Sequence, residues 1–363
     1  MIKIVGLFPL DGNGGIASWT KTFLREFPDN EYFVKGINTR MPLNSKAQPK
    51  WKHVLYGLFT ALRVRKELRK EISESHYDIM HTTTSGGLGS FRDLLAAKVC
   101  RKHGIKTILH CRYGCIPEDY TNKGLVGRLL NVSFSLYDQI WVLDNRTYNF
   151  LQKQPSLAQK IRLTPNPIEV KDRVDLKPKS YKRVGFVGNV LETKGIKELT
   201  KAVCQLSNTR LDIIGPANEK MLETLKEISG NKWGKEICYH GRVPNEQAVA
   251  KIKDMDIIVL PTYYRQEAFP MSIIESMSLS KLVISTRRAA IPDMLTDLDG
   301  GKCGILVEER NSEAIAEAIR WCQDNSLSAD KMCRKAYEKV YNAYRREIVY
   351  DMYRTNYQQL MKK

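Results

Sequence analysis

The chain has 363 residues, with 58 Lys and Arg against 40 Asp and Glu, which gives a net charge of +18. Its apolar content of 42% and charged content of 27% are those of a globular protein and exclude an intrinsically disordered chain. No apolar run approaches the ~20 residues that a membrane-spanning helix needs, and the N-terminus lacks a signal-peptide cleavage pattern. We therefore expect a cytoplasmic protein of two domains, with an excess of positive charge that indicates an anionic partner or surface.

The first half of the chain alternates short apolar runs with helical patterns, which is typical of βαβ units around a parallel sheet. The predicted strands are residues 2–8, 32–37, 78–81, 106–110 and 139–143. The clearest predicted helices are residues 15–27, 54–74 and 89–103.

A glycine-rich loop, GNGGIA at residues 12–17, follows the first predicted strand. Glycines here let backbone N–H groups approach an anion at the N-terminus of the next helix, so Gly14 and Gly15 are candidates for phosphate binding. The loop is also a GxGxxA variant of the dinucleotide fingerprint, which usually has an acid after the second strand. This chain has Asn38 and Arg40 there, and an arginine suits a phosphorylated cofactor. An NADP-dependent oxidoreductase and a turn without any ligand both stay open.

The helical pattern at residues 54–74 carries a strong positive charge. Apolar residues 55, 58, 59, 62 and 68 have helical spacing, and the basic residues that cluster beside them are Arg63, Arg65, Lys66, Arg69 and Lys70. One interpretation is a helix packed on the core with a solvated charged face. The other is a patch that docks on anionic lipid, which would place the protein peripherally on the inner face of the cell membrane. A nucleic-acid partner is not expected, because no nucleic-acid-binding motif accompanies the charge.

The alternation pauses at residues 163–183, which contain three prolines and no hydrophobic period and therefore indicate a linker. It resumes with predicted strands at 184–187, 211–214, 237–239, 256–260 and 282–285. The predicted fold class is α/β, with two doubly wound Rossmann-like domains that face each other across a cleft. We expect an N-terminal domain at 1–168, a C-terminal domain at 169–345, and a last helix from residue 346 to 363 that packs back on the first domain.

Two loops of the second predicted domain carry residues suited to an anion and to hydroxyl groups. Lys194 and Gly195 stand at the start of a helix, where a lysine and the helix N–H groups can together neutralise a phosphate. The stretch EAFPMSIIES holds Glu267 in a loop after a buried strand and Glu275 inside the next helix. Pro270 suits the first turn of that helix. Carboxylates at these places can accept hydrogen bonds from the vicinal hydroxyls of a ribose and from a second sugar ring.

These motifs resemble those of a known enzyme family. The stretch PTYYRQEAFPMSIIESMSLSKLVISTRRAAIPDML, residues 261–295, is similar to the signature of retaining glycosyltransferases of family 4, which have the GT-B fold. The glycine loop, ETKG, IIGPA, YHGRVP and TPNPI occur at the places usual for that family. The resemblance covers nearly the whole chain and is strongest from Gly185 to Asn311.

The resemblance implies a hexosyltransferase-type enzyme that moves a sugar from a nucleotide-diphosphate sugar, UDP- or GDP-linked, to a glycan or lipid-linked acceptor. The process would be the biosynthesis of a bacterial surface polysaccharide: capsule, exopolysaccharide or lipopolysaccharide. The first domain would lie on the acceptor side and the second would bind the donor. The base, the sugar and the acceptor are not specified by these motifs.

The resemblance also assigns roles to residues. Glu275 would bind the ribose, Glu267 the transferred sugar, and Lys194 the diphosphate. Catalytic roles would fall to His110, Lys194 and Glu267. The donor-binding residues would be Gly14, Gly15, Asn189, Lys194, Gly241, Arg242, Val243, Glu267, Ala268, Phe269, Pro270, Met271, Ser272 and Glu275.

The chain departs from the family pattern at Asn189, where an arginine often joins the lysine on the diphosphate. Arg112 is the residue that we expect to supply the missing cation. No cofactor and no metal are expected, because the DxD-like stretches at 254–256 and 297–299 precede a buried strand and a predicted turn. The N-termini of two helices and Lys194 would then stabilise the leaving group.

Eight cysteines are scattered along the chain, and only Cys111 and Cys115 lie close together. A CxxxC spacing is weak support for a metal site or a disulfide, so we expect reduced and mostly buried cysteines. A nonenzymatic sugar-binding module is a further alternative, although it would not need a diphosphate cradle.

Overall fold

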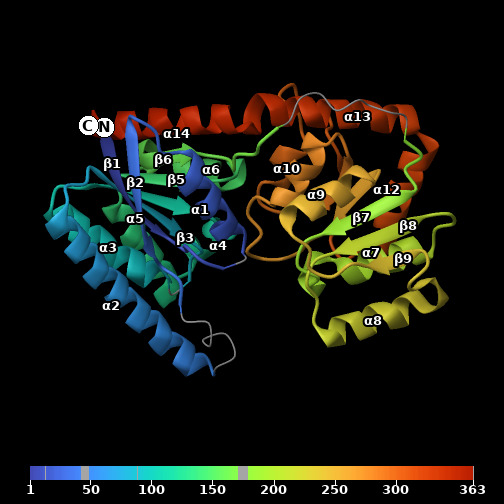
Figure 1. Ribbon diagram of the computed structural model, residues 1–363, viewed down its shortest axis with the longest axis horizontal. Helices are drawn as coiled ribbons and strands as arrows, with labels where there is room; N and C mark the ends of the chain where they lie inside the picture. The colour runs from blue at the N-terminus through green and yellow to red at the C-terminus, as the bar shows by residue number, and fades with distance from the viewer. Residues whose placement is uncertain (13, 42–48, 88, 171–178, 363) are drawn as a thin grey trace. The chain divides into compact units, whose positions relative to one another are not determined.

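The computed structural model describes residues 1–12, 14–41, 49–87, 89–170 and 179–362. Asn13 of the glycine loop and residues 171–178 of the predicted linker lie outside this range. The chain divides into two compact units (Figure 1): unit 1 is Met1–Asn166 with Val349–Lys363, and unit 2 is Pro167–Ile348. The division thus falls after Asn166, where the sequence suggested residue 168, and the C-terminal helix belongs with unit 1 from Val349 onward.

Unit 1 is built on a parallel sheet with the strand order β2-β1-β3-β4-β5-β6. Its strands are β1 (Ile2–Phe8), β2 (Tyr32–Asn38), β3 (Ile79–Thr84), β4 (Lys106–Cys111), β5 (Gln139–Val142) and β6 (Ile161–Leu163). Its helices are α1 (Gly15–Glu26), α2 (Lys50–Glu74), α3 (Gly89–Lys102), α4 (Ile116–Thr121), α5 (Leu125–Leu136), α6 (Asn145–Gln152) and the 3₁₀ turn η2 (Ala158–Lys160). A parallel sheet needs a crossover between successive strands, and these helices supply it.

The sheet of unit 1 has a separate core on each face, because successive residues of a strand point to opposite sides. Val5 lies in one cluster with Leu68 of α2 and with residues of α3 and α5. Ile4 lies in the other cluster with Phe23 of α1 and with Tyr353 of α14 (Arg346–Met361). Both faces are therefore covered by helices, which explains why the central strands β3, β4 and β5 are buried almost throughout, although they also contain polar residues.

Unit 2 repeats this architecture with the strand order β12-β11-β10-β7-β8-β9. Its strands are β7 (Arg183–Val187), β8 (Arg210–Ile214), β9 (Ile237–Tyr239), β10 (Ile257–Leu260), β11 (Leu282–Thr286) and β12 (Ile305–Val307). Its helices are α7 (Ile196–Cys204), α8 (Glu219–Ser229), α9 (Asn245–Lys253), α10 (Met271–Ser278), α11 (Ile291–Met294), α12 (Ser312–Asp324) and α13 (Ser326–Lys339). Shorter turns are η3 (Glu192–Lys194), η4 (Gly230–Lys232) and the π-helical η5 (Val340–Tyr344).

The predicted fold class is confirmed, since each unit is an α/β domain with an all-parallel sheet. The sequence does not reveal β6 and β12, because each strand has three residues and is too short to show a hydrophobic period. β6 also ends at Leu163, inside the stretch that the prolines mark as a linker. The cleft between the two units stays a prediction.

Candidate functional site

The candidate residues of unit 2 lie on loops at one edge of its sheet. In a parallel sheet the carboxyl ends of the strands share an edge, and ligands of doubly wound folds bind there. β7, β9 and β10 end at Val187, Tyr239 and Leu260, and the loops after them carry residues 188–195, 240–244 and 261–270. The two predicted loops, after β7 and β10, are therefore neighbours at this edge, and the loop after β9 lies on the same edge beyond β8.

The turn before α7 depends on a glycine. Gly195 has φ 74°, and a Cβ on it would lie 2.2 Å from the carbonyl oxygen of Pro261, so only glycine lets the turn pack against the end of β10. Gly195 is also the cap residue of α7. Lys194 thus lies immediately before the helix N-terminus, where the positive end of the helix adds to its own charge.

Lys194 and Glu267 form an ion pair between the end of η3 and the loop after β10. The Thr262 hydroxyl donates a second hydrogen bond, of 3.1 Å, to the same carboxylate oxygen. The ammonium also lies 5.3 Å from the centroid of the Tyr264 ring. Glu267 is buried and Lys194 is half-buried, so each charge is largely shielded from water and compensated by the other.

The segment that contains Glu267 leads directly into α10. Ala268, Phe269 and Pro270 are buried, whereas Met271 and Ser272, the first residues of the helix, are half-buried. Pro270 is the residue before α10 and not a member of its first turn, which corrects the predicted start by one position. The first N–H groups of a helix have no acceptor within it, so the N-terminus of α10 has donors for a ligand.

Glu275 lies in the middle of α10 and is half-buried. Burial raises the pKa of its carboxyl group, and a hydrogen bond with the side chain of Asn245 opposes that rise. Asn245 is the first residue of α9 and follows the segment 241–243. Gly241 of that segment has φ 67°, Arg242 is exposed and Val243 is half-buried. The structure thus connects Glu275 to the loop after β9.

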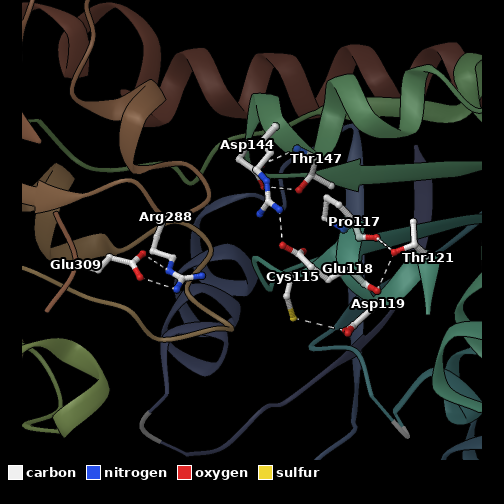
Figure 2. Close-up of polar contacts among 10 residues, drawn as sticks. Cys115, Pro117, Glu118, Asp119, Thr121, Asp144, Thr147, Arg288 and Glu309 are labelled. Carbon is white, nitrogen blue, oxygen red and sulfur yellow. Dashed lines mark hydrogen bonds and ion pairs between the residues drawn. The ribbon is translucent and has the colours of Figure 1, made fainter. Parts of the chain in front are cut away.

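A pocket of about 370 Å³ lies beside the loop that carries Lys194 and is lined by Glu192, Thr193, Glu198, Tyr263 and Arg310. The Arg310 guanidinium lies 4.5 Å from the centroid of the Tyr263 ring. The preceding residue, Glu309, forms an ion pair with Arg288 (Figure 2). None of the pocket residues was a candidate from the sequence.

The two DxD-like stretches have structural contacts. Asp256 precedes β10, at the edge of the sheet opposite the loops described above, and accepts hydrogen bonds from the backbone N–H groups of Lys182 and Arg183. Asp297 accepts from the N–H of Asp299 in its turn and pairs with Lys335 at 2.7 Å. Across the described ranges, no group of three or more His, Cys, Asp or Glu side chains is arranged for a metal ion. Catalysis without a metal stays a prediction.

In unit 1 the glycine loop precedes α1, with Gly14 as its cap residue and Gly15 as its first residue. Both glycines are exposed, and a Cβ on either would meet open space. Arg40, the residue that favoured a phosphorylated cofactor, pairs with Asp11 of the same loop at 3.2 Å. The arginine therefore has a structural partner within the loop.

His110 is fully buried near the end of β4, and both of its ring nitrogens are engaged. Nδ1 lies 3.2 Å from Nε2 of His81, and Nε2 lies 3.3 Å from the guanidinium of Arg112. Burial, with Arg112 and His81 nearby, holds the pKa of His110 well below its usual range. The ring is therefore neutral at pH 7, and Arg112 is the partner of its Nε2 atom. Its predicted contact with a sugar stays a prediction.

Arg112 itself follows β4 and is buried, with 8% of its surface exposed. Its guanidinium donates a hydrogen bond of 2.6 Å to Asn166 and lies 4.2 Å from the centroid of the Trp19 ring. Asn189 of unit 2, where an arginine would be usual in the resembled family, is exposed. The cation that the sequence suggested as a replacement thus belongs to unit 1.

Comparison with known proteins agrees with this geometry. Residues 167–340, nearly the whole of unit 2, match the family model for glycosyl transferases group 1. Unit 2 is a group 1 glycosyltransferase domain.

Curated relatives resemble the chain at low identity. An uncharacterised glycosyltransferase of Methanocaldococcus jannaschii is 22% identical over 273 residues, which span 69% of this chain and 67% of that protein. The capsular polysaccharide biosynthesis glycosyltransferase CapM of Staphylococcus aureus is 23% identical over 252 residues, which span 66% of this chain and 61% of that protein. The chain thus spans about two thirds of the length of these relatives.

Solved structures share the fold of the whole chain. Sucrose-phosphate synthase from Thermosynechococcus elongatus has a TM-score of 0.78 and 15% identity, with 100% of both chains covered. HepE of Anabaena, solved in complex with UDP, has a TM-score of 0.71 and 13% identity, with 99% of both chains covered. The GT-B fold inferred from the motifs is confirmed, and none of these comparisons supports the oxidoreductase alternative.

Unit 1 also contains a polar cluster after β4, which is shown in Figure 2. The Cys115 thiol lies 3.6 Å from the Asp119 carboxylate and does not pair with Cys111. Glu118 pairs with Arg146, and the Asp144 side chain caps α6 through the N–H of Thr147. The ion pair connects α4 to α6, and the cap stabilises the start of α6. The polar residues of this edge thus have structural contacts.

Helix α2 differs from a simple core-packed helix. Ala61, Val64 and Leu68 face the core and are buried. Six large apolar residues on the opposite side are between 41% and 68% exposed: Trp51, Val54, Leu55, Leu58, Phe59 and Leu62. Of the apolar residues that the sequence analysis named, Leu68 is therefore packed on the core, whereas Leu55, Leu58, Phe59 and Leu62 are exposed. The interpretation of α2 as a core-packed helix holds for its second half only.

The predicted basic patch on α2 is only partly available to a ligand. Arg63 pairs with Glu67 and donates hydrogen bonds to the carbonyl oxygens of Asn38 and Arg40 at 3.0 and 3.1 Å. Lys70 lies 3.8 Å from Glu74. The remaining members are Arg65, which is half-buried, and Lys66 and Arg69, which are exposed. In the described part of the chain, no helix is both long and apolar enough to cross a bilayer.

Proposed function

We propose that the chain is a retaining glycosyltransferase that transfers a sugar from a UDP- or GDP-sugar to a glycan or lipid-linked acceptor, without a bound metal or cofactor. The main support is the ion pair between Lys194 and Glu267 at the carboxyl edge of the group 1 domain, directly before the N-terminus of α7. The similarity to CapM favours a role in the biosynthesis of a bacterial surface polysaccharide.

The proposed chemistry follows from charge. When the bond between the anomeric carbon and the diphosphate breaks, negative charge develops on the leaving phosphoryl oxygens. The N-terminal N–H groups of α7 and α10 are fixed donors for that charge, in the manner of an oxyanion hole, and Lys194 is a cation next to them. On donor binding, Lys194 turns from Glu267 to the diphosphate, and the carboxylate of Glu267 then accepts hydrogen bonds from sugar hydroxyls. Glu275 accepts from the ribose hydroxyls, and the segment 241–243 borders the base.

Donor screening tests this proposal. UDP-, GDP- and ADP-sugars are compared by thermal shift, because a ligand at 100 times its Kd stabilises the folded state by about 2.7 kcal/mol. The sugar that binds is then incubated with oligosaccharide acceptors, and NMR of the product reports the anomeric configuration, which retention leaves as in the donor. Turnover that disappears in EDTA and returns with manganese or magnesium would contradict the metal-free part. Inverted product would contradict retention.

We further propose that α2 docks the enzyme peripherally on an anionic membrane. The exposed apolar residues of α2 recur at helical spacing from Trp51 to Leu62, and the same face continues as Arg65, Lys66 and Arg69. One outward face thus has an apolar half, which can enter the acyl boundary, and a basic half, which attracts anionic headgroups. A solvent-exposed apolar stripe of this size is unusual for a surface that meets only water.

Vesicle flotation separates the two halves of this face. The wild-type protein is expected to float with phosphatidylglycerol vesicles and much less with phosphatidylcholine vesicles. Phe59→Ser is expected to reduce flotation on both, whereas Lys66→Ala with Arg69→Ala removes the preference for the anionic lipid. Leu125→Ser, at a 68% exposed apolar residue of α5, is the matched control and should behave as wild type. Equal flotation of the wild type on both lipids would reject the anionic surface.

A further inference from the structure

We propose that Arg112 is a phosphoryl-binding cation of unit 1, held in place by a chain of hydrogen bonds through His110 and His81 to Tyr357. The proposal assigns a ligand group to a residue outside the group 1 domain. It rests on the proposed function only for the source of the phosphoryl group, which is the diphosphate of a donor or the phosphate of a lipid-linked acceptor.

Among the residues that the structure describes, none supplies a counter-charge to Arg112. The groups around its guanidinium are the His110 ring, the Asn166 side chain, the Trp19 ring and the Tyr353 hydroxyl, and all are neutral. Its Nε atom is buried and has no hydrogen-bond partner among the described residues. Buried cations in proteins are normally paired with an anion, because loss of hydration is costly. A buried arginine with neutral partners only is therefore prepared for an anion that comes from outside the chain.

The direction of the hydrogen-bond chain follows from what arginine can do. A guanidinium only donates, so Nε2 of His110 accepts from Arg112 and Nδ1 of His110 carries the proton. That proton is donated to Nε2 of His81, whose Nδ1 then donates to the Tyr357 hydroxyl at 2.6 Å. Every donor in the chain points away from Arg112. These hydrogen bonds hold the guanidinium in place, but they leave its positive charge unneutralised.

The protonation states agree with this geometry. Burial lowers the pKa of Arg112 to about 10, so the side chain stays charged at pH 7. Burial lowers the pKa of His81 to about 3, with Arg112 as a further cause, so that ring is neutral. Neither histidine adds a second positive charge or supplies a negative one.

The surroundings of Arg112 favour a phosphoryl group among anions. Trp19, on which the guanidinium lies, is in α1, one turn after the exposed glycines at the N-terminus of that helix. A Cβ on either glycine would meet open space, and the first N–H groups of a helix have no acceptor within it, so this N-terminus has donors for a ligand. A planar guanidinium and a helix N-terminus at the same edge of a sheet offer donors to several oxygens of one tetrahedral anion.

Binding of simple anions to the full-length protein tests the proposal. Sodium pyrophosphate and UDP represent the donor, and hexyl phosphate represents a lipid phosphate; their Kd values are measured by calorimetry and thermal shift at constant ionic strength. Arg112→Gln is expected to weaken binding of the effective probe by about 10- to 100-fold, as for the loss of a charged hydrogen-bond donor. Arg112→Lys keeps the charge and loses the planar guanidinium, so it is expected to weaken binding of the probe less. This variant replaces Arg112→Gln if the glutamine variant does not fold. Arg128→Gln, at an exposed arginine of α5, should bind as wild type.

The possible outcomes separate this inference from the proposed function. Loss of pyrophosphate or UDP binding in both Arg112 variants supports the donor as the source, and loss of hexyl phosphate binding alone supports a lipid phosphate. Variants that melt earlier but keep the wild-type Kd for all three probes would show a structural role and overturn the proposal, as would a wild type that binds none of them. Sugar transfer that persists unchanged in Arg112→Gln overturns this inference and leaves the proposed function intact. Anion binding that depends on Arg112, in a protein without transferase activity, supports this inference and rejects the proposed function.

Discussion

The carboxyl edges of the two sheets handle a buried cation in opposite ways. In unit 2, Lys194 is paired with Glu267, and a hydroxyl supports the same carboxylate. In unit 1, Arg112 contacts an imidazole, an amide and an indole ring, and no carboxylate of the described ranges pairs with it. The folds of the two units are alike, so the difference comes from the loop residues and not from the architecture.

The comparison indicates two ways to keep a cation ready for an anionic ligand. A paired lysine keeps the unliganded domain neutral at the site, but the ligand must compete with the glutamate. An unpaired arginine faces no competitor, but its desolvation cost must be offset by neutral dipoles. The predictions below test this contrast in order of the size of the expected effect.

The largest effect is expected from Lys194→Ala. Turnover should fall by roughly 10²–10³-fold, as for the loss of one preorganised donor to the leaving group. The protein should also lose stability, because Glu267 then keeps a buried charge without its cation. Single-turnover kinetics with saturating donor, together with thermal denaturation, measure both quantities.

Lys197→Ala is the matched control for that experiment. Lys197 lies three residues after Lys194, in the first turn of α7, is half-buried, and pairs with Glu192 at 3.0 Å. Its removal should leave turnover within about twofold of wild type, since surface ion pairs contribute little. If both lysines gave the same loss, the position of Lys194 at the start of α7 would have no special role.

The next effect is a loss of stability in acid that is confined to unit 1. The pKa values of His81 and His110 lie below the ordinary value near 6.5, so the unfolded chain binds more protons than the folded one below that pH. Stability therefore falls as the pH drops. His81 accounts for about 2 kcal/mol of this loss at pH 5 relative to pH 7.5, and His110 adds a loss of the same sign. Hydrogen exchange of peptides from β3 and β4, corrected for intrinsic rates, measures it.

Two variants sharpen the acid prediction. His81→Gln should lose the part of the pH-dependent component that the His81 ring contributes, and the part that comes from His110 should remain. His103→Gln changes an exposed histidine after α3 and should keep all of it. Equal protection of β3 and β4 at both pH values would mean that the two rings are hydrated in solution.

The sequence predicts the fold well because its strong signals are local. Apolar runs and the glycines that follow them place β1 and β9 at their observed bounds. β6 and β12 are held in the sheets by pairing with β5 and β11. A stretch of three residues is too short for its own sequence to predict such a pairing. The buried residues Val64 and Leu68 of α2 lie in one core cluster with residues of α3, and apolar spacing alone could not separate them from the exposed apolar residues of the same helix.

The site was predictable where a motif fixes both residue and backbone. Lys194-Gly195 is one such case, since the left-handed turn requires the glycine that the motif contains. The partners of these residues were not predictable. The pair of Lys194 with Glu267, separated by 73 residues, and the chain from Arg112 to Tyr357 depend on strands that come together only in the folded sheet. His81 had no signal at all, because a histidine inside an apolar strand resembles any core residue.

A smaller effect is expected at Glu275. Glu275→Gln should weaken UDP binding by about tenfold, the usual cost of a hydrogen bond to a charged group. Because burial raises the pKa of Glu275, the neutral amide should also make the unliganded protein slightly more stable. Glu246→Gln, at an exposed residue of α9, is the control and should change neither property. A variant that loses stability and binds UDP normally would assign Glu275 to the structure alone.

The smallest effect is expected at the far end of the hydrogen-bond chain in unit 1. Tyr357→Phe removes the acceptor of the His81 Nδ1 proton and should cost about 1 kcal/mol of stability, as for one buried hydrogen bond. Its effect on pyrophosphate binding should stay below twofold, because the tautomer of His110 is fixed by Arg112 and not by the distant tyrosine. Urea denaturation and calorimetry on the same preparation give the two values. A large loss of anion binding with little loss of stability would contradict this order. It would mean that Tyr357 fixes the tautomers of His81 and His110, and that the hydrogen bonds determine the charge of Arg112 as well as its position.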